Sequence, residues 1–61
     1  MTQKLLTVDE VAERLRRTPA AIRAMRYEGK GPKSAKVAGR VMWREEDVDA
    51  YIEGQFTETS A

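Results

Sequence analysis

The 61-residue sequence contains no cysteine and no histidine, and only 7% of its residues are aromatic. These absences exclude disulfide bonds and thiolate or imidazole metal sites, so packing alone must hold the fold. No apolar run approaches the roughly 18 residues that cross a bilayer, and residues 1–6 lack the pattern of a signal peptide. We therefore expect a cytoplasmic protein that has no membrane partner and needs no metal or cofactor.

Acidic residues are nearly absent from the middle of the chain. The net charge is only +1, yet residues 14–44 carry ten basic residues and one acid, a local charge of +9. The flanks are acidic, with −2 over residues 1–13 and −6 over residues 45–61. Clustered cations repel one another unless a polyanion relieves the repulsion, so this distribution favours nucleic acid as the partner. Ordinary solvation of surface charge is the alternative.

A helix start is encoded between Thr7 and Glu10. In this pattern, a capping box, the Thr7 hydroxyl accepts from the Glu10 amide and the Glu10 carboxylate accepts from the Thr7 amide. Apolar residues follow at helical spacing and predict one buried face, made of Val8, Val11, Ala12 and Leu15. We therefore predict a first helix that begins after Thr7 and reaches Leu15.

A second helix should follow after the dipeptide Arg16-Arg17. Thr18 is a suitable N-cap and Pro19 suits the first helical position, so the helix is predicted over residues 19–28. Gly29 is well placed as its left-handed terminus. The residues expected to face the core are Ile22 and Met25, and those expected on the accessible face are Ala20, Arg23, Ala24 and Tyr27.

Two short strands are predicted next, over residues 34–37 and 40–43, joined by the two-residue turn Ala38-Gly39. A two-stranded ribbon is marginal alone, so it must pack against the helices. Trp43 belongs in the core, because a domain of this size needs its largest side chain inside. The other hairpin residues able to pack there are Val37 and either Val41 or Met42.

A third helix is predicted from the acidic residues 45–47, which suit the positive end of a helix dipole. Its buried stripe should consist of Val48, Tyr51 and Ile52. Gly54 should end it, leaving residues 1–54 as one domain and residues 55–61 as a flexible tail. The order helix, tight turn, helix, hairpin, helix is that of a winged helix-turn-helix, mainly α with three helices and a two-stranded wing.

No pattern in the sequence indicates catalysis. There is no histidine or cysteine to act as base or nucleophile, and the single glycine cluster is not a phosphate-binding loop. The carboxylates of residues 45–49 fit helix-start charges better than a paired acid and base. We therefore expect a binding protein, not an enzyme.

Three segments resemble a known family. LLTVDEVAERL, TPAAIRAMRYEGKGP and GRVMWREEDVDAYI resemble, in that order, the short winged helix-turn-helix domains of phage excisionases, or recombination directionality factors, of the MerR-like group. The likeness covers residues 5–52 and is most specific in the third segment, where the wing-tip Gly39 and Arg40 precede an apolar residue, an aromatic and an acidic helix start. The sequence departs from the family pattern in two places: Arg16-Arg17 replaces Gly or Asn followed by an apolar residue, and Met42 replaces a residue that is often basic.

The resemblance implies a protein that binds several sites beside a phage attachment sequence, bends the DNA and directs a tyrosine integrase toward prophage excision. It implies that the second helix enters the major groove through Thr18, Ala20, Arg23 and Tyr27. It also implies that Arg40 on the wing lies in or beside a minor groove. The expected partners are double-stranded DNA at the attachment-site flank, a phage integrase and further copies of the chain along the DNA.

The chemistry of the individual side chains suggests which part of the DNA each one contacts. Arginine can pair bidentately with guanine, so Arg23 is the first candidate for a base contact. Thr18 offers a hydroxyl at the positive end of a helix, where a phosphate binds well. Tyr27 could bind a phosphate or pack on the wing, and Arg26 could reach a phosphate while its stem covers the core rim. The further residues expected to contact phosphate are Arg16, Arg17, Lys33 and Lys36.

Two other functions stay open at this level. A small transcriptional regulator of the same fold would bind a promoter through the same helix and wing. A protein-interaction adaptor or antitoxin would instead use the acidic third helix as its working surface.

Overall fold

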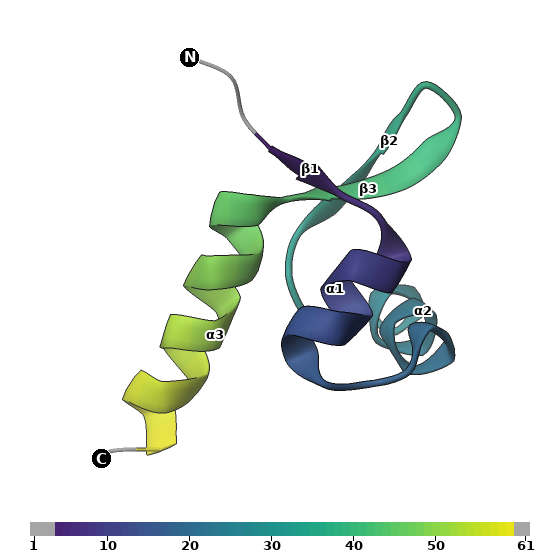
Figure 1. The fold of residues 1–61 in the computed structure, drawn as a ribbon. Helices are drawn as coiled ribbons and strands as arrows, with labels where there is room; N and C mark the ends of the chain where they lie inside the picture. The colour runs from purple at the N-terminus through teal and green to yellow at the C-terminus, as the bar shows by residue number, and fades with distance from the viewer. Residues whose placement is uncertain (1–3, 60–61) are drawn as a thin grey trace.

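Six elements make up the part of the chain that the computed structural model describes, residues 4–59 (Figure 1). In chain order they are β1 Leu5–Leu6, α1 Val8–Leu15, α2 Pro19–Tyr27, β2 Ser34–Val37, β3 Arg40–Arg44 and α3 Glu45–Thr59. The strands form one antiparallel sheet in the order β1-β3-β2. The architecture is the predicted winged helix-turn-helix, with α1 and α2 as the helix pair and β2–β3 as the wing.

Helix α1 begins as the sequence predicts. The Thr7 N–H donates to Glu10 Oε1 at 2.8 Å and the Glu10 N–H donates to Thr7 Oγ1 at 3.3 Å, which completes the capping box. The backbone N–H of Thr7 holds the pKa of the Glu10 carboxyl below its ordinary value. Val11 and Ala12 are buried, and Val8 and Leu15 pack at the edge of the same cluster.

The connection between α1 and α2 places Arg16 in a left-handed conformation, with φ of 57°. Glycine favours this region, and an arginine there carries a steric cost. Two backbone bonds hold the turn: the Arg16 N–H donates to the Glu13 carbonyl at 3.2 Å and the Arg17 N–H to the Ala12 carbonyl at 2.9 Å. The tight turn therefore forms without the usual glycine or asparagine.

Helix α2 is bounded by the predicted residues. The Thr18 Oγ1 accepts from the Ala21 N–H at 3.1 Å, and Pro19 occupies the first helical position. At the other end Gly29 has φ of 76°, and the Lys30 N–H donates to the Met25 carbonyl at 2.8 Å. Together with the bond from the Gly29 N–H to the Arg26 carbonyl, at 3.0 Å, this bond forms a Schellman motif and turns the chain toward the hairpin.

The sheet has three strands where the sequence predicted two. Ala38 and Gly39 both have positive φ, 52° and 82°, as a type I′ hairpin turn requires. The additional strand is β1, whose Leu5 and Leu6 pair with the last two residues of β3. Strand β1 occupies the β3 edge that the wing leaves open, so the predicted number of two strands is wrong.

The core lies between the helices and one face of the sheet, and it consists of Leu6, Val11, Ala12, Ile22, Trp43 and Val48. Trp43 is only 2% exposed, and Val41 packs against the same cluster, so these predictions are confirmed. Val37 is 41% exposed, and its predicted core position is wrong. Register explains the error: Val37 pairs with Arg40, one residue out of step with Val41, and alternate residues of a strand face opposite sides.

Helix α3 follows β3 without a connecting loop and extends away from the strands (Figure 1). The Glu45 N–H donates to the Lys4 carbonyl at 2.9 Å, which joins the helix start to the chain before β1. Val48 is buried, while Tyr51 and Ile52 are partly buried. The predicted end at Gly54 is wrong, because the helix continues to Thr59.

Gly54 lacks the positive φ of a left-handed terminus, so it acts as an ordinary helical residue. Of the segment expected to be a tail, residues 55–59 are helical and residues 60–61 lie outside the described part of the chain. Between residues 4 and 59, no helix combines the length and apolarity that a membrane span requires.

Candidate nucleic-acid interface

The face of α2 that points away from the core is accessible, as the helical spacing predicts. Its residues are Ala20, Arg23, Ala24 and Tyr27, and all four are exposed. Ile22, between them in sequence, is buried against the core and fixes the rotation of the helix. The Tyr27 side chain is 92% exposed, so it does not pack on the wing. The two small alanines leave α2 shallow enough for close approach by a large partner.

A groove of about 580 Å³ separates this helix from the wing. Helix α2 contributes Arg23, Arg26 and Tyr27, and β3 contributes Arg40, Val41, Met42 and Trp43. The start of α1 closes the remaining side with Thr7, Val8 and Asp9. The fold therefore brings predicted contact residues of the second helix and of the wing to one opening.

Arg26 of the groove connects α2 to the hairpin. Its Nε–H donates to the Ser34 Oγ at 2.9 Å, joining α2 to the first residue of β2. The side chain is nevertheless exposed, and a guanidinium has four further N–H groups to offer a phosphate. The sequence predicted a residue with its stem at the core rim and its head available; the contact with Ser34 was not predicted, because it depends on how the hairpin lies against α2.

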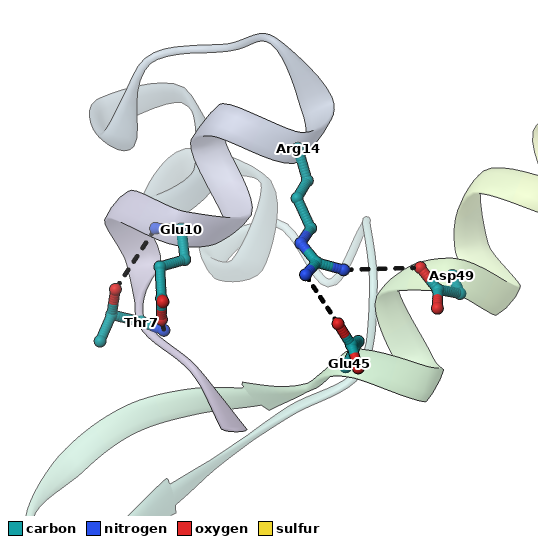
Figure 2. A network of polar contacts seen from close by, with 5 residues as sticks. All are labelled: Thr7, Glu10, Arg14, Glu45 and Asp49. Atoms are coloured by element: carbon teal, nitrogen blue, oxygen red, sulfur yellow. Dashed lines mark hydrogen bonds and ion pairs between the residues drawn. The ribbon is translucent and has the colours of Figure 1, made fainter. Parts of the chain in front are cut away.

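Two cations of the basic segment are neutralised by acids of α3. Arg14 lies 2.7 Å from Glu45 (Nη2 to Oε2) and 3.8 Å from Asp49 (Nη1 to Oδ1), which joins α1 to α3 (Figure 2). The Arg44 Nε–H donates to Asp47 Oδ2 at 2.7 Å, and this bond raises the pKa of the guanidinium. These arginines connect elements of the fold and are not part of the groove.

The remaining predicted cations are exposed, and none of them forms an ion pair with a described carboxylate. They are Arg16, Arg17, Arg23, Arg26, Lys33, Lys36 and Arg40. An exposed cation without a carboxylate partner keeps its full charge for an external anion. The cations still do not all share one surface: Lys33 lines a separate cavity of about 350 Å³ with Leu5 and Val37.

The start of α2 lies outside the groove and carries Thr18, preceded by Arg16 and Arg17. The Thr18 hydroxyl accepts the Ala21 N–H, which leaves its own proton free to be donated. Backbone N–H groups at a helix start also favour an anion. This end of α2 therefore has the chemistry to bind an anion.

Sequence reasoning treated the start of α1 as a capping segment and missed that Asp9 lines the groove. Only the tertiary arrangement reveals this position, since α1 and the wing are far apart in sequence. Within residues 4–57, no three acidic side chains come close enough together to hold a metal ion.

Comparison with known proteins places this geometry in a family. No curated protein sequence and no solved structure matches the chain significantly. The sequence model of the helix-turn-helix domain family matches residues 5–55, a span that contains the helix pair, the wing and most of α3. It includes every residue of the groove and the start of α2. The chain therefore belongs to the helix-turn-helix domain family, which includes excisionase-like DNA-binding proteins.

Proposed function

We propose that the protein is a sequence-specific, DNA-bending architectural factor that acts as an excisionase, directing a phage tyrosine integrase toward prophage excision. The observation that carries the DNA-binding part is the groove between α2 and β3, which gathers Arg23, Arg26 and Arg40 without a neutralising ion pair among the described residues. The excisionase role rests on the resemblance of the three sequence segments. No catalytic role is assigned to the chain.

In this proposal α2 enters the major groove. Arg23 donates bidentately to a guanine, the commonest specific contact of an arginine. Ala20 allows the helix to approach the base edges closely, and Tyr27 and Arg26 donate to phosphates at the groove wall. The start of α2 binds a further phosphate through Thr18, with Arg16, Arg17, Lys33 and Lys36 adding attraction that does not depend on sequence.

The wing explains why bending accompanies binding. Arg40 lies at the tip of the hairpin next to Gly39, and a mobile guanidinium suits a narrow, electronegative minor groove. A duplex held by α2 in one groove and by Arg40 in the next is drawn around the domain. Such deformation costs about 1–6 kcal/mol for a short site, which the added contacts offset.

Binding to DNA can be tested without knowing the target. Duplexes that bind the protein are selected from a randomised pool, and the affinity of the best is measured by fluorescence anisotropy across a salt series. Four or more phosphate contacts predict a log-log slope of about −3 or steeper. A flat salt dependence would instead favour the adaptor function, with DNA as a minor partner.

The excisionase role needs a second experiment. Circular permutation of the selected site should reveal a bend that Arg40→Ala reduces. A footprint on both flanks of the attachment site, together with increased excision when integrase is present, would support the role. Protection restricted to a promoter, with excision unchanged by the protein, would favour the transcriptional regulator of the same fold. Further copies bound along the flank would appear as extended protection.

A further inference from the structure

One acidic side chain lies in the otherwise basic groove between α2 and the wing. Asp9 belongs to the first turn of α1 and lines the same groove as Arg23, Arg26 and Arg40. Its side chain is exposed. A carboxylate here opposes the attraction that the three arginines exert on phosphate, so its position calls for a physical explanation beyond helix formation.

The capping of α1 does not need this carboxylate. Thr7 and Glu10 form the capping box between themselves, through both of its hydrogen bonds. Among the ion pairs of the described residues none includes Asp9. Its negative charge interacts favourably with the positive end of the α1 dipole. An acid on a face of the helix turned away from the groove would give the same benefit. The charge of Asp9 is thus available inside the groove.

A carboxylate is selective among the groups that a duplex presents. It accepts hydrogen bonds only, so it can pair with the exocyclic amino group of cytosine or adenine in the major groove, and it cannot pair with guanine O6 or thymine O4. It repels phosphate oxygens at any sequence. Beside three arginines it therefore favours one placement of the duplex, with an amino-bearing base edge against α1 and the backbone elsewhere.

We propose that Asp9 is a specificity-determining residue of the groove, which accepts from the exocyclic amino group of a cytosine or adenine and disfavours placements that bring phosphate to the start of α1. The inference rests on the proposed DNA binding, since it names the chemistry that the same groove selects. Arg23 selects a guanine, its neighbouring arginines supply affinity, and Asp9 removes affinity from the wrong sequences.

The test compares two alanine variants that remove one carboxylate each from α1. Asp9→Ala changes the groove, and Glu13→Ala changes an exposed position of the same helix that does not line it. Each variant is put through selection from a randomised duplex pool, and its affinities for the wild-type site and for an unrelated duplex are measured at one salt concentration. Circular dichroism confirms that the compared samples are folded.

We expect Asp9→Ala to bind the unrelated duplex more tightly and to lose the preference for cytosine or adenine at one position of the selected site. The ratio of specific to non-specific affinity should fall about 5- to 150-fold, the range of one base contact. Glu13→Ala should keep the wild-type preference. Asp9→Glu, which retains the charge, should keep weak binding to the unrelated duplex even where the longer side chain shifts the base preference.

Equal effects of the two alanine variants would overturn the inference, because a general change of net charge would then explain them. An unchanged specificity ratio in Asp9→Ala would overturn it as well. In both cases the wild-type protein still binds DNA and the proposed function stands. If the wild-type protein binds no duplex at all, the proposed function and the inference both fall.

Discussion

The groove between α2 and β3 and the junction between α1 and α3 use arginine in opposite ways. At the junction Arg14 is bound by Glu45 and Asp49, and its side chain is 33% exposed. In the groove Arg23 is exposed and no ion pair of the described residues includes it. Charge counted along the sequence cannot distinguish the two, because both lie in the same basic segment.

The difference shows how the acidic flank contributes to the domain. Acids at the start of α3 neutralise the cations that lie near them, and this holds α3 beside α1 (Figure 2). Partly exposed ion pairs stabilise a fold only weakly, so their clearer effect here is to take Arg14 out of the set of cations available to an external anion. The predicted contact cations have no such carboxylate partner among the described residues. The local excess of positive charge is thus concentrated on the helix pair and wing.

The largest expected effect comes from the residue that joins the two regions. Trp43 pairs with Leu6 and Ser34 in the sheet and is separated from α3 only by Arg44. Truncating a buried aromatic residue costs about 3–5 kcal/mol, which is comparable with the whole stability of many small domains. We therefore expect Trp43→Ala to unfold the protein, so that neither the groove nor the junction between α1 and α3 forms. Circular dichroism across a urea series measures this.

Val37→Ala is the matched control, since it removes an apolar side chain from the exposed face of the same hairpin. It should change the urea midpoint little. A folded Trp43→Ala with a native-like midpoint would show that the hairpin and α3 do not depend on the tryptophan.

The next effect separates the two arginine environments directly. Arg23→Ala should weaken binding to a selected duplex by about 1–3 kcal/mol while leaving the urea midpoint near the wild-type value. Arg14→Ala should do the reverse, lowering stability by up to about 1 kcal/mol because an ion pair is lost and leaving DNA affinity nearly unchanged. Fluorescence anisotropy measures the duplex affinity of each variant, and urea denaturation measures the unfolding midpoint of each variant. Similar losses of DNA affinity in both would mean that the groove has no special role.

A smaller effect concerns the turn that precedes α2. Arg16 has φ of 57°, so Arg16→Gly relieves a left-handed conformation but gives the unfolded chain more freedom. The balance should stabilise the fold by about 0.5–1 kcal/mol, while removal of a cation should weaken non-specific DNA binding and make the salt slope shallower by about one phosphate contact. Arg17→Gly, at a position without positive φ, is the control and should not stabilise. Destabilisation by Arg16→Gly would contradict the strain argument.

Much of the fold was predictable because its signals are local. The capping box at Thr7, the Thr18-Pro19 helix start and the Ala38-Gly39 turn each depend on a few neighbouring residues, and the structure confirms all three. The burial of Trp43 was predictable for a different reason, since few residues of so short a chain can fill its core.

The errors have a common physical origin in pairing and tertiary context. Strand β1 has two residues, too few to show alternation, and exists because β3 offers a free edge. The exposure of Val37 follows from register, which the turn sets but composition does not reveal. Gly54 was expected to end a helix, yet glycine only permits a helix to end there.

The candidate site divides in the same way. The exposed face of α2 followed from helical spacing, so Arg23 and Tyr27 could be identified from the sequence. The pairing of Arg14 with α3 and the position of Asp9 in the groove required the packed structure, because each brings together segments distant in sequence. Contact of Arg23 and Asp9 with DNA stays a prediction that Arg23→Ala and Asp9→Ala test.

The smallest expected effect is a pH dependence at the start of α1. The Thr7 N–H lowers the pKa of Glu10 in the folded state, so the charged form contributes stability above the unfolded-state pKa. That contribution is lost as the pH falls through the folded-state value. Glu10→Gln keeps a side chain able to complete the capping box but removes the titration, so its urea midpoint should converge with that of the wild type below the ordinary glutamate range. A Glu10→Gln midpoint that stays equally far from the wild-type midpoint across the whole pH series would refute the assigned cause.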